Sequence, residues 1–196
     1  VGPTARPGPT VMTTPLPASG PRTQSNRGLR ILPSATTVLA ICAGLTSIKF
    51  ALDGRPHVAL ALIGAAAILD GIDGGIARAL HAQSPMGAEI DSLADAVNFG
   101  VAPALVVYIT LLPTSPIGWI FVLLYAVCIV LRLARFNTLL DDETRPAYTR
   151  QYFVGMPAPC GAVGVIGPLA AMLQYGQGWW TSTWFVCLWL AANSVL

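Results

Sequence analysis

Four carboxylates stand between long apolar runs of the chain, where charged side chains are rarely tolerated. They form two pairs, Asp70 with Asp73 and Asp91 with Asp95, and the members of each pair are three or four residues apart. Residues at these spacings share one face of a helix. A carboxylate near the centre of a bilayer costs about 2.5–3.5 kcal/mol, so the four together need a compensating charge. We therefore expect two facing helices to direct all four carboxylates toward one or two hard divalent cations, which prefer oxygen ligands.

Small residues and one arginine accompany these aspartates. Gly74 and Ala77 remove side-chain bulk from the helix of the first pair, so a phosphate or a flat group could approach the backbone there. Small residues serve close helix packing equally well, and the sequence leaves this alternative open. Arg78 supplies a cation suited to phosphate, and Gly87 relieves crowding where the next helix begins. A structural role is reasonable for any one aspartate, but the combination predicts a functional site.

The composition indicates a helical membrane protein. Of the 196 residues, 54% are hydrophobic and only 10% are charged, whereas about a quarter of the residues of soluble domains are charged. This composition excludes an ordinary soluble domain, favours an all-α, polytopic transmembrane helical bundle and gives no indication of a nucleic-acid partner. The four cysteines occur at irregular spacing inside apolar segments, which is typical of small buried residues rather than of a disulfide framework or a zinc site.

Apolar windows long enough to cross about 30 Å of hydrocarbon predict about six spans. They lie near residues 33–52, 57–80, 87–112, 116–138, 154–175 and 179–196. Residues 31–196 are therefore predicted to form one transmembrane domain, which we expect to be truncated because its last apolar window reaches Leu196 without a polar flank. Residues 1–30 are rich in Pro, Gly, Thr and Ser and contain no acidic residue, which predicts a disordered, basic tail. Residues 1–11 precede Met12 and are interpreted as lying upstream of a start codon.

The distribution of positive charge predicts the orientation in the cell membrane. Nine of the eleven Lys and Arg residues fall in the N-terminal tail, next to the 79–86 turn or within residues 132–150. By the positive-inside rule, these parts face the cytoplasm. The aspartate pairs would then lie toward the cytoplasmic ends of the second and third spans. Trp179, Trp180 and Trp184 are interpreted as anchors at the opposite interface.

The arrangement Asp70-x2-Asp73-Gly74-x2-Ala77-Arg78-x8-Gly87-x3-Asp91-x3-Asp95 resembles the signature of the CDP-alcohol phosphatidyltransferase family at all of its fixed positions. The resemblance extends over the whole apolar chain, because six helices also form the family's core. It implies that residues 31–196 are a catalytic domain that transfers a phosphatidyl group from a CDP-linked lipid to an alcohol and releases CMP. It further implies dependence on Mg²⁺ or Mn²⁺ and a homodimeric assembly.

The resemblance also assigns roles to individual residues. Asp70, Asp73, Asp91 and Asp95 would ligate the metal, and Asp91 and Asp95 would be the catalytic residues, with Asp95 as the general base. Gly74, Ala77, Arg78 and Gly87 would line the pocket for the CDP group. The family commonly has Pro-Asn before a threonine in the first helix, and Ser34 stands here in place of that Asn while Thr37 is retained. Thr37 is therefore included in the expected nucleotide pocket, whereas a contact from the missing Asn is not expected.

The acceptor is indicated by three further segments. Residues 91–104 (DSLADAVNFGVAPA), 132–137 (RLARFN) and 153–159 (FVGMPAP) resemble the phosphatidylserine synthase branch of the family. This resemblance implies CDP-diacylglycerol as the donor and L-serine as the acceptor. Arg132 or Arg135 could pair with the serine carboxylate. The alternative for each arginine is a topology anchor that reaches the membrane interface.

Two other functions remain open. A synthase of the same family could use glycerol phosphate or inositol phosphate, although a phosphorylated acceptor should require a denser basic pocket than Arg132 and Arg135 provide. A cation transporter could also place carboxylates inside the membrane. Transporters often repeat interrupted helices in two halves, whereas this chain carries the acidic motif once, so the enzyme is favoured. No Ser or Cys nucleophile paired with a histidine is evident, which favours direct displacement over a covalent phosphatidyl-enzyme.

Overall fold

The computed structural model describes residues 2, 25–79, 85–140 and 158–195. Within these ranges all regular structure is helical, which confirms the predicted all-α class. In chain order the elements are α1 (Ser25–Leu52), α2 (Pro56–Ala79), α3 (Pro85–Asp95), the π-helix η1 (Ala96–Val101), α4 (Ala102–Leu111), α5 (Pro116–Leu140), α6 (Ala158–Val165), α7 (Gly167–Tyr175), the 3₁₀ turn η3 (Trp179–Thr181) and α8 (Thr183–Val195).

Two helices, α2 and α5, agree closely with the predicted windows. Pro56 and Pro116 stand at their first positions, where a missing N–H costs little. The α1–α2 turn ends at Gly54, whose φ of 70° is the left-handed conformation that favours glycine. The Arg55 N–H donates to the Phe50 carbonyl across this turn over 2.9 Å. The first two helices therefore form a tight antiparallel hairpin.

The first helix is longer than predicted. It begins at Ser25, inside the segment expected to be a tail, and continues through Pro33. The prediction placed the start at residue 33 because proline is favoured in the first turn of a helix. It relied on continuous apolar runs, so it could not detect a helical extension in which polar residues interrupt the apolar ones. Pro33 instead lies inside the helix, where it removes one backbone N–H donor.

The predicted span 87–112 is one rod with a π-turn in the middle. Pro103 lies four residues after Phe99 and has no N–H to donate to the Phe99 carbonyl. The Tyr125 hydroxyl of α5 donates to that carbonyl instead, over 3.0 Å. Both Tyr125 and Phe99 are fully buried. The wider turn thus fastens α5 to the centre of this rod.

The two C-terminal windows are interrupted rather than continuous. The window 154–175 contains α6 and α7, which are separated at Ile166, with Pro168 near the start of α7. Gly176, at a φ of 81°, ends α7. The window 179–196 contains η3 followed by α8. A count of apolar residues does not detect these breaks, because every residue around Ile166 is compatible with a membrane interior.

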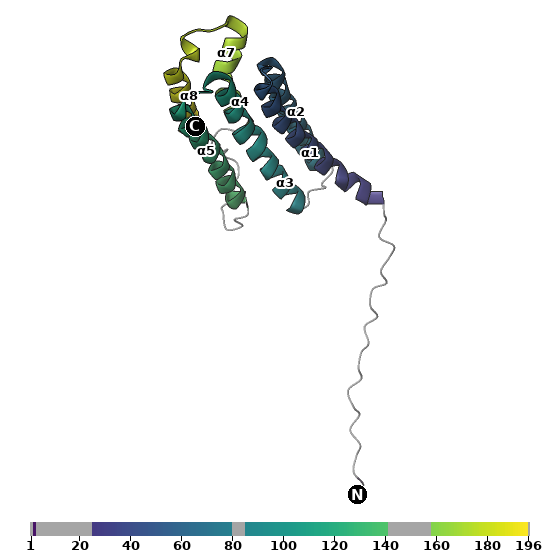
Figure 1. Cartoon of the computed structure of the whole chain (residues 1–196). Helices are drawn as coiled ribbons and strands as arrows, with labels where there is room; N and C mark the ends of the chain where they lie inside the picture. The colour runs from purple at the N-terminus through teal and green to yellow at the C-terminus, as the bar shows by residue number, and fades with distance from the viewer. Residues whose placement is uncertain (1, 3–24, 80–84, 141–157, 196) are drawn as a thin grey trace.

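The helices pack as a bundle around α4 and η1. In Figure 1, α1 and α2 lie side by side, α3 and α4 follow one another in the middle, and α5 and α8 lie on the other side. Contacts between α1 and α3, η1 and α4, and between α5 and η1, α4 and α8, hold these parts together. The buried centre includes Val106, Val107, Leu169 and Leu190.

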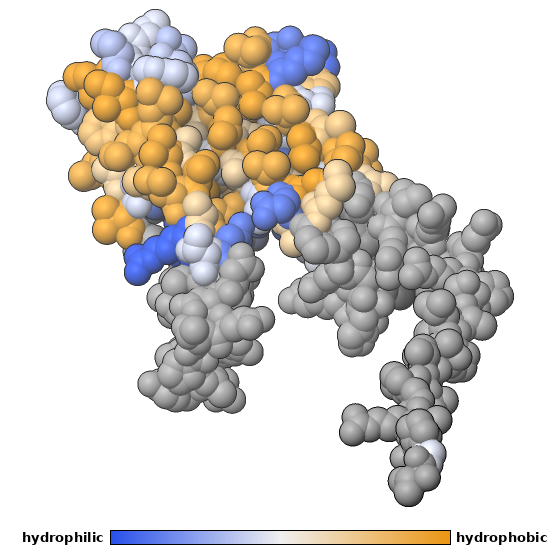
Figure 2. Space-filling view, turned by 90° about the horizontal axis from the view of Figure 1, so that it is seen from below, coloured by the Kyte–Doolittle hydropathy of each residue, from blue (hydrophilic) through white to orange (hydrophobic). Residues whose placement is uncertain are grey.

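The outer surface is apolar, as expected of a membrane protein. Among the described residues, three segments are long and apolar enough to cross a membrane, namely Ala35–Leu52, Met86–Leu111 and Pro116–Thr138. Pro56–Ile72 and Thr183–Val195 are shorter apolar helices. Figure 2 shows hydrophobic residues over most of the coloured surface, with hydrophilic residues in small areas at its edges. Because only 22% of the Pro116–Thr138 window is buried, its exposed side chains suit contact with lipid.

Candidate active site

The α3 helix carries the second aspartate pair one turn apart. Asp91 and Asp95 are both half-buried, and the Oδ1 atom of Asp95 is buried. Asp95 is the last residue of α3 and directly precedes the π-turn. Single π-turns within helices occur frequently at functional sites. Gly87, one turn before Asp91, is also half-buried.

The α2 helix carries Asp70 and an open strip of glycines. Asp70 and Gly74 are half-buried. A Cβ added at Gly71, Gly74 or Gly75 would meet no described atom within 4 Å. Among the described residues, no side chain therefore covers the backbone at these glycines, as an approaching phosphate requires. This favours the phosphate interpretation of Gly74 over close helix packing, and the role of Gly74 stays a prediction.

Close helix packing occurs at another glycine, Gly44 of α1. A Cβ there would overlap the Asn98 amide oxygen of η1. Gly44 belongs to a buried face of α1 that also contains Thr37, Ala40, Ser47 and Ala51. Thr37 is only 5% exposed, so it lies inside the bundle, toward the end where α1 begins. The sequence motif did not include Gly44 or Asn98, because the contact joins helices that are far apart in the chain.

The α5 helix distinguishes its two arginines. Arg132 is half-buried, whereas Arg135 is exposed. Arg132 and Tyr125 are seven residues apart on α5 and therefore share one face of the helix, and the Tyr125 hydroxyl points into the bundle at the Phe99 carbonyl. Of the two arginines, Arg132 is therefore the one on the inner face of α5. The exposed position of Arg135 matches the alternative of an interfacial anchor.

A hydrogen bond joins this end of α5 to the aspartate helix. The Asn137 Nδ2 atom donates to the Ser92 Oγ atom over 2.7 Å. Ser92 stands between Asp91 and Asp95 in the sequence, and Asn137 follows Arg132 by five residues. The RLARFN segment stands out in the sequence, but Asn137 has no predicted role, because no local pattern indicates a contact between two residues 45 positions apart.

The structure describes the backbone but not the side chains of several expected site residues. The side chains of Asp73, Ala77 and Arg78, and all of residues 80–84 and 141–157, lie outside the described part of the chain. The described residues contain no group of three or more His, Cys, Asp or Glu side chains that could hold a metal ion. The convergence of all four aspartates therefore stays a prediction. The donors themselves suit a hard divalent cation, since they are carboxylates, and the Asp95 Oδ1 atom is buried.

Comparison with known proteins agrees with the sequence motif. The sequence profile of CDP-alcohol phosphatidyltransferase matches residues 30–192. The chain belongs to this family. Metal dependence is general in the family, and the match extends from α1 to α8, so that it includes every helix that carries a candidate site residue.

Several curated relatives share one printed name, CDP-diacylglycerol–serine O-phosphatidyltransferase. The protein of that name from Mycobacterium leprae is 68% identical over 178 residues, which are 91% of this chain and 59% of the relative. The one from Mycobacterium bovis is 65% identical over 176 residues, 90% of this chain and 62% of the relative. The one from Bacillus subtilis is 39% identical over 132 residues, 67% of this chain and 71% of the relative. The chain thus spans about three-fifths of the two mycobacterial relatives.

Proposed function

We propose that the protein is a phosphatidylserine synthase, which transfers the phosphatidyl group of CDP-diacylglycerol to the hydroxyl of L-serine and releases CMP. The observation that carries this proposal is the 68% identity, over 91% of the chain, to a relative named for that reaction. The site supports it, because half-buried carboxylates on two helices and a half-buried arginine lie in a mainly apolar bundle.

The carboxylates Asp70, Asp73, Asp91 and Asp95 would hold Mg²⁺ or Mn²⁺, which neutralises charge on the diphosphate oxygens of the donor. The open backbone at Gly74, with Ala77 and Arg78 on the following turn, would receive the CDP group, and Thr37 and Gly87 complete this pocket. The accessible glycine strip supports this assignment.

The Asp95 carboxylate is proposed to take the proton of the serine hydroxyl. The serine oxygen then forms a bond to the phosphorus of the phosphatidyl group, and the bond from that phosphorus to CMP breaks. CMP leaves with the bonding electron pair, so no covalent enzyme intermediate is required. The position of Asp95 beside the π-turn, with a buried Oδ1 atom, supports a carboxylate kept away from bulk water.

The Arg132 guanidinium is proposed to pair with the serine carboxylate. Among the described arginine side chains it is the half-buried one, since Arg55 and Arg135 are exposed. One inward cation suits a carboxylate, whereas a phosphorylated acceptor calls for a denser basic pocket. The alternative acceptors, glycerol phosphate and inositol phosphate, are therefore not favoured, and family membership disfavours the cation transporter.

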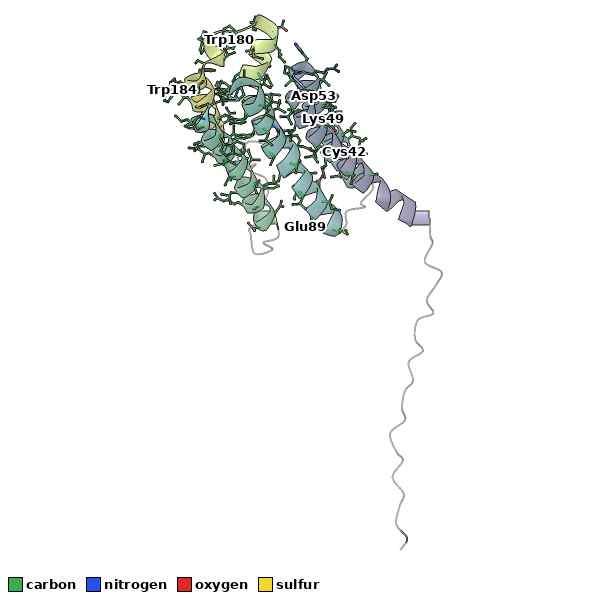
Figure 3. All side chains as sticks on the ribbon, viewed as in Figure 1. Cys42, Lys49, Asp53, Glu89, Trp180 and Trp184 are labelled. Atoms are coloured by element: carbon green, nitrogen blue, oxygen red, sulfur yellow. The ribbon has the colours of Figure 1, made fainter. Side chains whose placement is uncertain are left out.

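The membrane arrangement is proposed to be six spans and a homodimer, with the site facing the cytoplasm. The placement of the aspartate helix and of the tryptophans toward opposite ends of the bundle supports this proposal. Figure 3 shows Glu89, which precedes Asp91 on α3, at one end, and Asp53 and Trp180 toward the opposite end. The tryptophans Trp179 and Trp184 are 70% and 76% exposed, which suits residues at a membrane interface.

The first test is release of CMP by the full-length protein in liposomes that contain CDP-diacylglycerol. We expect release that requires both L-serine and Mg²⁺ or Mn²⁺. The Asp95→Asn variant should lower kcat by about 10²–10⁴-fold, the usual contribution of a general base, while still binding the donor. Glu89→Gln, which changes an exposed carboxylate on the same helix, is the matched control and should leave kcat unchanged. Full activity of Asp95→Asn would refute the assignment of the base.

A further inference from the structure

The α3–η1 rod and α5 are joined by two contacts at different positions along their length. At the π-turn, the Tyr125 hydroxyl donates to the Phe99 carbonyl over 3.0 Å. Ile129 lies against Gly100 just beside this contact, with its Cγ2 atom 3.3 Å from where a Gly100 Cβ would be. Farther along both helices, Asn137 donates to Ser92 over 2.7 Å.

The proposed general base and the arginine proposed to bind the acceptor lie between these two contacts. On α5, Arg132 stands between Tyr125 and Asn137, and on the other rod Asp95 stands between Ser92 and Phe99. Because α3 and α5 run in opposite directions (Figure 1), the two contacts bracket Arg132 and Asp95 from both ends. The contact at the π-turn is made by two fully buried residues, Tyr125 and Phe99. The Ser92–Asn137 contact is a partly buried pair of side chains.

We infer that Ser92 and Asn137 are a positioning pair, which sets the separation between the Arg132 guanidinium and the Asp95 carboxylate and thereby the affinity for the acceptor amino acid. This inference rests on the proposed function. An acceptor held by its carboxylate at Arg132 must present its hydroxyl to Asp95, so its binding depends on the distance between α5 and α3. Displacements of about 1 Å at such a site change rates substantially.

The CDP-diacylglycerol donor should depend much less on this pair. Its expected contacts lie on α2, at Gly74 and beyond, and on α1 at Thr37, and neither helix takes part in the Ser92–Asn137 hydrogen bond. A purely structural role would lower stability and affect both substrates alike. Loss of a positioning pair should instead raise KM for L-serine and leave KM for CDP-diacylglycerol nearly unchanged.

The experiment measures KM for L-serine and for CDP-diacylglycerol in the full-length protein and in Asn137→Ala, Ser92→Ala and the double variant. Loss of one hydrogen bond should raise KM for serine by about three- to tenfold, with KM for the donor changed less than about twofold. The double variant should show no further loss, because the first change already breaks the contact. Ser92→Thr keeps the hydroxyl and should restore KM for serine.

The matched control is Thr138→Ala. Thr138 is exposed, and its hydroxyl donates to the Arg135 carbonyl of the same helix over 2.8 Å. Loss of this hydroxyl should therefore leave both Michaelis constants unchanged. A KM for serine like that of the wild type in Asn137→Ala or Ser92→Ala would overturn the positioning pair, and so would an equal rise for both substrates. If the wild-type protein itself shows no serine-dependent CMP release, the proposed function fails as well. The two failures are therefore distinguishable, and Ser92→Ala, which removes a single oxygen atom, serves if Asn137→Ala does not fold.

Discussion

Arg132 and Arg135 lie three residues apart on α5 but in different surroundings. Arg132 is half-buried and shares a face of α5 with the buried Tyr125, whereas Arg135 is exposed. From the sequence alone, the two are equal candidates for binding the serine carboxylate, because both have the same charge and belong to the same segment. Helical geometry separates them, since residues three apart differ by about 60° around the axis. At the scale of single residues, burial therefore favours Arg132 as the arginine proposed to bind the substrate carboxylate.

The two arginines provide a matched pair of variants. Arg132→Gln should raise KM for L-serine by about 10- to 100-fold, which is the usual cost of losing a hydrogen bond to a charged group. Arg135→Gln should change it less than about twofold, since exposed charges contribute little. Steady-state kinetics with a fixed, saturating concentration of CDP-diacylglycerol measures both. Equal effects of the two changes, or a larger one at Arg135, would show that Arg132 does not bind the acceptor.

At the scale of helices, the presence of helices could be predicted from the sequence better than the breaks within them. The lengths of the apolar windows predicted the ends of α2 and α5 to within a few residues. It missed the π-turn and the break at Ile166, because hydrophobicity says nothing about which carbonyl a proline leaves without a donor. The signal for the π-turn was nevertheless present, since Pro103 lies four residues after Phe99. The donor from Tyr125 could not be predicted, as it comes from another helix, 26 positions away.

The Tyr125 hydroxyl should stabilise the π-turn measurably. Tyr125→Phe keeps the ring but removes the donor to the buried Phe99 carbonyl, which costs about 1–3 kcal/mol and should lower the midpoint of thermal unfolding by about 2–10 °C. Tyr108→Phe is the control, because Tyr108 contacts Trp119 through its ring, with 5.2 Å between centroids. Thermal unfolding in detergent micelles measures both variants. An unchanged midpoint for Tyr125→Phe would mean that the hydroxyl does not stabilise the turn.

Glycines of α1 and α2 should respond oppositely to the same change. Gly44→Ala would drive a methyl group into the buried Asn98 amide and should destabilise the fold by about 1–3 kcal/mol. Gly74→Ala meets open space among the described residues, so it should retain or gain up to about 1 kcal/mol through helix propensity.

The same two variants separate packing from binding. Gly74→Ala should raise KM for CDP-diacylglycerol, because the methyl group occupies the backbone surface that the CDP group approaches. Stability and donor KM, measured side by side, test both assignments. A destabilised Gly74→Ala protein with unchanged donor KM would identify Gly74 as a packing residue after all.

At the scale of the whole molecule, the apolar helical bundle and the family could be predicted from the sequence, and the match to the family profile confirms the family. What could not be predicted are the contacts between helices distant in the chain, such as Gly44 with Asn98 and Ser92 with Asn137. These depend on tertiary packing, which leaves no local pattern. Convergence of the four carboxylates stays a prediction, since the Asp73 side chain lies outside the described residues.

The choice of acceptor is the central claim, and one measurement tests it most directly. The full-length protein in liposomes with CDP-diacylglycerol and Mg²⁺ or Mn²⁺ is given L-serine, glycerol 3-phosphate and inositol phosphate at equal concentrations. Mass spectrometry then identifies the lipid products, and CMP is quantified in parallel. We expect phosphatidylserine as the main product, with one CMP released per lipid formed. A phosphorylated product, phosphatidylglycerol phosphate or phosphatidylinositol phosphate, in excess over phosphatidylserine would contradict the account.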